Sequence, residues 1–279
     1  MKGQIVKISS DLCFVNYEDK IYPCKSRGLF RKEHITPVVG DYVLFDKDKL
    51  LIEKIFSRKN CFQRPKVSNV DQAFLITSLK IPDFSLYLLD KFLVLMEINH
   101  VKPIICITKE DLLSTDEVAQ IWKVLEYYEN IGYTVVSNRD LDTIEELLRG
   151  KTSVFTGQTG AGKSTLLNCL NPEWNLETGE VSRALGRGRH TTRVVELFEL
   201  FGGKVMDTPG FSALDFPNYT NEQIKDAFIE FKRYSCPFSD CSHTKEKECV
   251  VRREVFANNI LKSRYLNYLN FIGVDIDES

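Results

Sequence analysis

The chain has 279 residues, of which 43% are hydrophobic and 27% charged, and its formal net charge is −2 at pH 7. These values are typical of a soluble globular protein of two or three domains, and they exclude a polycation, so any nucleic-acid surface must be a local patch. The sequence lacks a signal peptide and an apolar run long enough to span a membrane, so we expect a cytoplasmic protein without a membrane partner.

The first part of the chain predicts a small β-barrel. Short apolar runs at residues 4–8, 13–17, 20–24, 41–45 and 50–55 are separated by turn residues such as Gly28 and Gly40, and none has a helical period. Five such strands favour an OB-type barrel, which we assign to residues 1–60. A barrel of this kind either binds an oligonucleotide or only docks on its neighbour, and the strand pattern leaves both readings open.

A basic connector follows the barrel. Residues 54–66 contain five Lys or Arg side chains and no acidic one: Lys54, Arg58, Lys59, Arg64 and Lys66. The segment is either a solvated linker or a contact to a phosphate backbone.

From Val70 onward, strands and helices alternate. We expect strands at residues 72–79, 103–107, 133–136 and 153–156, with helices at residues 85–99, 115–130 and 141–149 between them. Apolar strands without polar alternation indicate a parallel sheet covered on both faces, whose ligands bind at the carboxyl ends of the strands. We assign this α/β domain to residues 61–218.

The second of these strands ends in Thr108, Lys109, Glu110 and Asp111, which resembles the N-K-x-D element of GTPases. A carboxylate at Asp111 can accept two hydrogen bonds from the N1–H and N2–H₂ edge of guanine, and adenine offers no such pair of donors. Lys109 can lay its stem along the base. Thr108 departs from the usual Asn, which predicts some loss of rigidity or affinity without loss of guanine choice. The alternative is an ordinary strand-to-helix turn capped by an acid.

A phosphate-binding loop follows the strand at residues 153–156. Its motif is G-x-x-x-x-G-K-S, and the predicted nucleotide contacts are Gly157, Gln158, Thr159, Gly160, Ala161, Gly162, Lys163, Ser164 and Thr165. The glycines let backbone N–H groups surround phosphate oxygens, and the next helix points its positive end at the same anion. Lys163 reaches the β- and γ-phosphates, and the Ser164 hydroxyl can ligate Mg²⁺.

The order of these parts is reversed relative to ordinary GTPases. Here the base-recognition motif precedes the phosphate loop, whereas GTPases usually place it near the end of the domain. The same parts in rotated order indicate a circularly permuted P-loop GTPase domain, which compact domains tolerate because their termini often lie close together.

Two switch-like motifs come after the phosphate loop. Residues 172–193 are rich in Gly and Arg and contain Thr192, which we expect to ligate Mg²⁺ when the γ-phosphate is present. The motif D-x-x-G at Asp207 and Gly210 is expected to hold Mg²⁺ through water and to sense the γ-phosphate. Phe211 stands where Ras-like enzymes place a water-orienting Gln, so unaided hydrolysis should be slow. His190 is the candidate catalytic residue, because an imidazole can orient or deprotonate water, but it can equally contact phosphate, RNA or solvent.

The tail predicts a structural zinc site. Cys236, Cys241, His243 and Cys249 supply three thiolates and one imidazole, a closed tetrahedral set with no open position for catalysis. This short segment has little core of its own, so the metal would supply folding energy. We assign a zinc-binding helical domain to residues 219–279, with a helical stretch at residues 250–271.

Barrel, permuted GTPase and Cys₃His tail together resemble the ribosome small-subunit-dependent GTPase A family over essentially the whole chain. The resemblance rests on TKED before GQTGAGKS, then GRGRHTT, DTPGF and the zinc set. It implies a monomeric enzyme that converts GTP to GDP with Mg²⁺ and binds the small ribosomal subunit and its rRNA late in maturation. It also implies that the subunit stimulates hydrolysis and that hydrolysis releases the factor.

Two other functions remain open from the residues themselves. One is a P-loop ATPase or kinase, which Asp111 disfavours. The other is an RNA-binding module that senses GTP with little turnover, which Phe211 keeps possible. For the permuted GTPase, the second switch leads directly into the tail, so its ordering by the γ-phosphate could move or lock the zinc domain.

Overall fold

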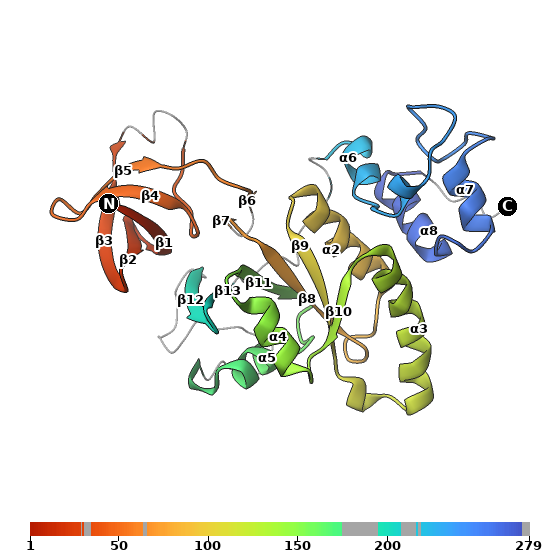
Figure 1. Ribbon diagram of the computed structural model, residues 1–279, viewed down its shortest axis with the longest axis horizontal. Coiled ribbons are helices and arrows are strands. Elements are labelled where there is room, and N and C mark those ends of the chain that lie inside the picture. The colour runs from red at the N-terminus through yellow and green to blue at the C-terminus, as the bar shows by residue number, and fades with distance from the viewer. Residues whose placement is uncertain are drawn as a thin grey trace.

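The computed structural model describes residues 1–28, 30, 35–63, 66–174, 195–207, 216 and 219–274. Figure 1 shows the barrel and the helical C-terminal unit on opposite sides of a central α/β unit. Among the residues described, none of the helices combines the length and the apolar character needed to cross a bilayer.

The N-terminal unit is the expected barrel of five strands. Its strands are β1 (Lys2–Ser9), β2 (Leu12–Tyr17), β3 (Lys20–Ser26), β4 (Tyr42–Asp46) and β5 (Leu51–Ile55). Antiparallel pairing joins β1 to β2, β2 to β3 and β4 to β5, while β3 and β5 are parallel, and the pairing of β1 with β4 closes the barrel. Ile5, Val15, Val43 and Ile52 fill its interior with no exposed surface.

The central sheet has the strand order β10-β9-β8-β11-β13-β12. Its strands are β8 (Gln72–Ser78), β9 (Lys102–Thr108), β10 (Thr134–Ser137), β11 (Thr152–Gly157), β12 (Glu196–Leu200) and β13 (Gly203–Asp207). Neighbouring strands run parallel except for β12 and β13, which form an antiparallel hairpin. The predicted parallel sheet is therefore confirmed, and it carries one antiparallel edge strand.

Helices cover both faces of this sheet. The helices α2 (Leu86–Ile98) and α3 (Thr115–Ile131) pack on one face, and α4 (Leu141–Leu148) and α5 (Lys163–Leu170) pack on the other. The starts of α2 and α3 follow from local chemistry, because Ser85 caps the first and a Ser114–Glu117 capping box begins the second. Two-sided burial explains why the strands read as continuous apolar runs.

The basic connector is ordered around a short hairpin, β6 (Cys61–Gln63) and β7 (Lys66–Ser68). Arg58 and Lys59 form ion pairs with Asp41 and Asp71 at 2.7 and 2.9 Å. Arg58 is therefore bound to a buried carboxylate within the fold, whereas the Lys59 side chain is 55% exposed and its contact with a phosphate backbone stays a prediction.

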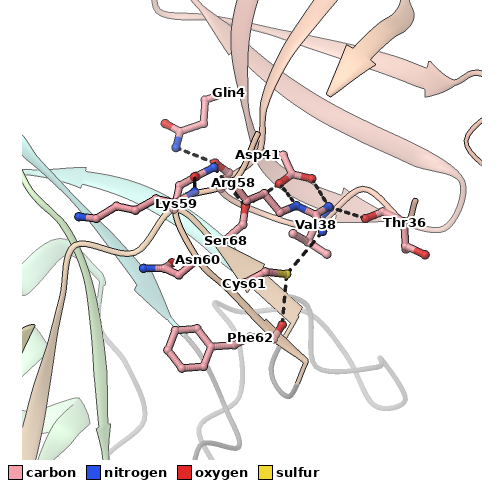
Figure 2. A network of polar contacts seen from close by, with 12 residues as sticks. Gln4, Thr36, Val38, Asp41, Arg58, Lys59, Asn60, Cys61, Phe62 and Ser68 are labelled. Atoms are coloured by element: carbon pink, nitrogen blue, oxygen red, sulfur yellow. Dashed lines mark hydrogen bonds and ion pairs between the residues drawn. The ribbon is translucent and has the colours of Figure 1, made fainter. Parts of the chain in front are cut away.

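Figure 2 shows the polar network where the barrel meets this hairpin. The buried carboxylate of Asp41 accepts hydrogen bonds from Arg58 Nε at 2.7 Å, Arg58 Nη2 at 2.8 Å, Ser68 Oγ at 2.6 Å and the Val38 N–H at 2.9 Å. The adjacent Gly40 has φ +97°, and a Cβ there would lie 2.1 Å from the Ser68 carbonyl oxygen, so this position requires glycine. The network fixes the connector to the base of the barrel.

The barrel also contacts the β12–β13 hairpin. Lys7 of β1 is paired with Glu196 of β12 in register, and their side chains form an ion pair at 2.9 Å. On the next strand, Lys204 Nζ donates to Gln4 Oε1 at 2.5 Å. Barrel and central sheet thus share hydrogen bonds at the edge formed by β12 and β13.

The C-terminal unit contains α6 (Asn221–Asp226), α7 (Val250–Phe256) and α8 (Lys262–Phe271). The single helical stretch expected at residues 250–271 was wrong in one respect, because α7 ends in a turn in which Asn258 has φ +60° and α8 begins anew. The unit packs on α2 through an apolar cluster that includes Val94. Arg264 of α8 is fully buried and forms ion pairs with Asp90 of α2 at 2.7 Å and with Glu230 at 2.5 Å.

Candidate nucleotide site and metal centre

The phosphate loop lies between β11 and α5, at the carboxyl edge of the central sheet. Gly160 and Gly162 adopt left-handed conformations with φ of 79° and 101°, and a Cβ on Gly157 would lie 2.3 Å from the Ile76 carbonyl oxygen. The motif's glycines are therefore required by backbone conformation and by close packing against β8. Within the described chain no side chain caps α5, so its first N–H groups point toward the place where phosphate would bind.

The base-recognition segment follows β9, two strands away from β11. Thr108 is buried, and its hydroxyl donates to the Ala161 carbonyl oxygen at 2.6 Å. This hydrogen bond joins the end of β9 to the phosphate loop across the intervening strand β8. The next residue, Lys109, has φ 61°, and its Nζ donates to the Ile81 carbonyl oxygen.

Glu110 cross-links three elements around this segment. Its carboxylate oxygens accept hydrogen bonds from Trp122 Nε1 on α3 at 2.8 Å and from Ser137 Oγ at the end of β10 at 2.7 Å. The sequence pattern grouped Glu110 with the nucleotide contacts, but both of its oxygens serve internal donors. The Glu110 side chain therefore holds this segment against α3 and β10, and its contact with the nucleotide stays a prediction. The part played by Trp122 had no signal in the sequence.

Asp111 is exposed beside Arg139. The Asp111 carboxylate lies 3.5 Å from Arg139 Nη2, and the side chains are 64% and 61% exposed. Such a pair contributes at most about 1 kcal/mol, because water screens both charges. The Asp111 carboxylate is therefore accessible to other hydrogen-bond donors, and its role in recognising guanine stays a prediction.

The D-x-x-G motif, which is predicted to hold Mg²⁺, begins at the same edge of the sheet. Strand β13 runs parallel to β11, with Met206 opposite Val154, and it ends at Asp207 next to the strand that leads into the phosphate loop. The backbone positions of Ser164, Thr165 and Asp207 thus belong to neighbouring ends of elements at one edge. Thr192, His190, Gly210 and Phe211 lie outside the described residues, and the roles assigned to them stay predictions.

The four tail residues Cys236, Cys241, His243 and Cys249 come together in the C-terminal unit. Their ligand atoms all lie within 4.8 Å of one another, so the group could hold a metal ion. Cys236 Sγ is 3.8 Å from Cys249 Sγ, and His243 Nδ1 is 3.6 and 3.4 Å from these two sulfurs. Sulfur ligands about 2.3 Å from a tetrahedral zinc ion would be about 3.8 Å apart, so the residues fit a Cys₃His site with His243 binding through Nδ1.

The surroundings act differently on the ligands. Burial raises the pKa of the Cys236 thiol, but hydrogen bonds from the Val251 and Val250 backbone and with Cys241 and Cys249 lower its pKa overall. Burial raises the pKa of Cys241 to about 12 and also raises the pKa of Cys249. Burial, followed by the charge of Lys225, lowers the pKa of His243 and so keeps the imidazole neutral. The hydroxyl of Tyr265 donates to the His243 carbonyl oxygen at 2.8 Å and holds the loop in place.

Two family models match the chain. The model described as RsgA GTPase matches residues 55–217, and the model described as RsgA N-terminal domain matches residues 2–50. The GTPase model therefore covers the central sheet, both nucleotide motifs and nearly all of the connector, and the second model covers the first four strands of the barrel.

Curated relatives match over nearly the whole chain. A protein of Bacillus subtilis named small ribosomal subunit biogenesis GTPase RsgA is 45% identical over 287 residues, covering 97% of this chain and 96% of the relative. One of Oceanobacillus iheyensis, named small ribosomal subunit biogenesis GTPase RsgA 2, is 45% identical over 281 residues, with coverage of 97% and 96%.

Two solved structures are similar in fold. One is YloQ, titled a circularly permuted GTPase, with a TM-score of 0.82 and 40% identity over 97% of this chain and 93% of that one. The other is YjeQ from Thermotoga maritima, with a TM-score of 0.85 and 35% identity over 98% and 99%. The reversed order of motifs in this chain is thus matched by a solved permuted GTPase.

Proposed function

This chain belongs to the RsgA GTPase family and is a GTP phosphohydrolase, and from that premise we propose that it binds the small ribosomal subunit late in its maturation. The observation that carries the nucleotide assignment is the hydrogen bond from Thr108 to Ala161, because it joins a guanine-type loop to a phosphate loop. The names of relatives such as the Bacillus subtilis protein support the ribosomal partner.

In this proposal, Asp111 reads the guanine edge and Lys109 lies along the base. The phosphate loop and Lys163 hold the phosphates, and Ser164, Thr192 and Asp207 would hold Mg²⁺, which would supply neutralisation of the charge on the β- and γ-phosphates. Thr165 lies in the first turn of the same helix, and the Gly210 N–H reports the γ-phosphate. Glu110 keeps the base loop in position through its contacts to Trp122 and Ser137.

Hydrolysis is proposed to depend on the partner. Phe211 cannot orient water, so the isolated protein turns over slowly, and the subunit brings His190 or an equivalent group to the attacking water. Conversion of GTP to GDP then releases the factor from the subunit.

The tail is proposed to bind one structural Zn²⁺ through Cys236, Cys241, His243 and Cys249. The full set of four ligands leaves no open position, and the ion would hold together the loops that precede α7. We keep the domain boundaries at residues 1–60, 61–218 and 219–279, and we propose a cytoplasmic monomer that contacts rRNA.

The test is phosphate release from GTP and from ATP, with and without purified small subunits, at stated salt concentration. Slow GTP turnover that subunits strongly accelerate supports the proposal. An unchanged rate with subunits would leave the chain as a GTP-binding RNA module, and equal ATP turnover would overturn the assignment of Asp111.

A further inference from the structure

A group of basic and aromatic side chains crosses three neighbouring strands on the outside of the barrel. The register pairs Lys2 of β1 with Leu44 of β4, and Leu44 with Lys54 of β5. Beside them lie Tyr42 and Phe56, whose backbones are joined by a 2.9 Å hydrogen bond from the Phe56 N–H to the Tyr42 carbonyl oxygen. We call Lys2, Tyr42, Lys54 and Phe56 the barrel platform.

Strand alternation turns the barrel platform outward. Val43 and Phe45, which alternate with Tyr42 and Leu44 along β4, are buried in the barrel core. Lys54 is paired with the outward-phase Leu44, because the register between β4 and β5 shifts at this point and the buried Ile52 pairs with Phe45. Lys2 and Lys54 are exposed, Tyr42 is 37% exposed and Phe56 is half-buried.

The lysines of the platform lie over its rings. Lys2 Nζ is 5.4 Å from the ring centroid of Tyr42 and 5.3 Å from that of Phe56, and Lys54 Nζ is 5.6 Å from the Phe56 centroid. Among the residues that the structure describes, neither Lys2 nor Lys54 has an acidic partner, because Asp46 and Glu53 pair with Lys49 and Arg27 instead. The platform therefore presents two positive charges and two aromatic rings on one surface.

We infer that the barrel platform binds a single-stranded segment of RNA, with a base stacked on Tyr42 or Phe56 and neighbouring phosphates on Lys2 and Lys54. This inference rests on the proposed ribosomal partner and names a surface for it. Stacking of a base on an aromatic ring is stronger than an exposed cation–π contact, so a base displaces the ammonium group from the ring. The displaced ammonium then lies beside the phosphate of the same nucleotide.

The occupant follows from the combination of groups. An acidic protein segment would use the lysines and leave the rings without a matching partner, whereas a nucleotide uses both. The platform offers no arrangement of donors and acceptors for base edges other than the Tyr42 hydroxyl, so binding should tolerate different sequences.

The platform stays accessible when the barrel is docked. Contact with the central sheet runs from Lys7, which pairs with Glu196, to Gln4, the register partner of Tyr42, which accepts a hydrogen bond from Lys204. Gly40 and Asp41 meet the connector just before β4 begins. The platform therefore borders this interface, and Lys2, Tyr42 and Lys54 keep their exposure with the barrel docked.

The experiment measures binding of the full chain to a fluorescein-labelled, single-stranded oligouridylate of ~12 nucleotides over a series of salt concentrations. In Lys2→Gln/Lys54→Gln, the slope of log affinity against log salt should fall by about 1.4, because each lost phosphate contact contributes about 0.7. In Tyr42→Leu/Phe56→Leu, which keeps apolar bulk without a π face, affinity should fall at least about five-fold for each stacked base. The matched controls are Lys20→Gln/Lys47→Gln and Ile21→Ala, which change exposed barrel residues outside the platform.

Each result decides between the inference and its alternatives. Platform variants that bind the RNA as the controls do would overturn the inference, as would a wild-type chain that ignores the RNA. Loss of binding to a poly-glutamate peptide, with RNA binding unchanged, would assign the surface to an acidic protein and also overturn it. Co-sedimentation with small subunits distinguishes failure of this inference from failure of the proposed function. A wild-type chain that does not sediment with the subunits contradicts the proposed function itself. Unchanged GTP turnover without subunits shows that the variants are folded.

Discussion

The hydroxyl of Thr108 donates a 2.6 Å hydrogen bond to the carbonyl oxygen of Ala161 and thereby couples the guanine-type loop to the phosphate loop. Both residues are buried, at 2% and 1% exposure, so water cannot replace the contact. The Thr108 hydroxyl thus fixes the end of β9 to the phosphate loop, although it lacks the second donor that an Asn side chain at this position would offer.

The first prediction concerns this contact. Thr108→Val keeps the shape of the side chain but leaves the Ala161 carbonyl without its donor, which costs about 1–3 kcal/mol of stability. The phosphate loop should be less well ordered, and affinity for GDP, measured by titration calorimetry, should fall. Thr108→Ser retains the hydroxyl and is the control. Equal GDP affinity for the Val and Ser variants would refute the coupling.

A second prediction concerns base choice. In Asp111→Asn, one acceptor of the carboxylate becomes an amide donor that faces the donor edge of guanine, so affinity for GTP should fall by about 100-fold or more. Affinity for xanthosine triphosphate should rise, because its 2-carbonyl group accepts that amide. Competition against labelled GDP measures both. Arg139→Gln should change GTP affinity only slightly, since its pair with Asp111 is exposed. An Asp111→Asn variant with ordinary GTP affinity would exclude Asp111 from the base site.

A third prediction concerns the junction between barrel and connector. Arg58→Gln leaves the Asp41 carboxylate buried with no charged partner, which should lower the free energy of unfolding by about 3 kcal/mol. Chemical denaturation followed by tryptophan fluorescence and circular dichroism provides the measurement. The exposed pair of Lys49 with Asp46 is the matched control, and Lys49→Gln should have an effect below about 0.5 kcal/mol. Similar values for the two variants would show that the Asp41 network adds no more than a surface pair.

A fourth prediction concerns the buried ion pairs of Arg264. Arg264→Lys removes the planar guanidinium that donates hydrogen bonds to Asp90 and Glu230 at once. One carboxylate would then remain buried and unpaired, which should lower the free energy of unfolding by about 3–5 kcal/mol. Hydrogen exchange should then rise in α8 and in the facing part of α2. Arg253→Gln, an exposed change on α7, is the control. Exchange confined to α8 would show that these ion pairs do not hold the C-terminal unit to the central one.

A fifth prediction concerns the metal. A zinc chelator should remove one ion per chain and increase hydrogen exchange between residues 235 and 256, because the loop has few apolar contacts of its own. Cys249→Ser should have the same effect, since it removes a ligand that also caps α7. The nucleotide affinity of the chelated protein tests whether the effect is local. A chain that contains no zinc when purified under reducing conditions would contradict the site.

Much of the fold could be read from local sequence. Apolar runs, capping residues and glycine motifs predicted the barrel strands and the parallel sheet with most ends within two residues, because these features depend on neighbours in the chain, but the β6–β7 hairpin and α6 were not predicted. Arg58 and Arg264 could not be predicted in the same way. Each reads as an ordinary surface cation, and only the fold brings Asp41, Asp90 and Glu230 to them.

The nucleotide site shows the same limit. Its motifs were recognisable, since spacing alone defines a phosphate loop, but the inward role of Glu110 depends on Trp122 and Ser137, which lie on other elements. Similarly, the break between α7 and α8 was missed because residues 257–261 carry neither proline nor glycine. Asn258 supplies the left-handed turn there.

The permuted order has a consequence for synthesis of the chain. Strand β8 lies between β9 and β11 in the sheet, but β9 is the next strand along the chain, after α2, whereas β11 is made only after α3, β10 and α4 as well. At about 5–20 residues per second, one edge of this apolar strand stays unpaired for on the order of ten seconds in the nascent chain. The base loop already exists during this interval, but the phosphate loop does not. GTP can therefore bind only after β11 has paired with β8 and the phosphate loop has formed. By mass action, the bound nucleotide then stabilises the completed fold relative to the incomplete nascent chain.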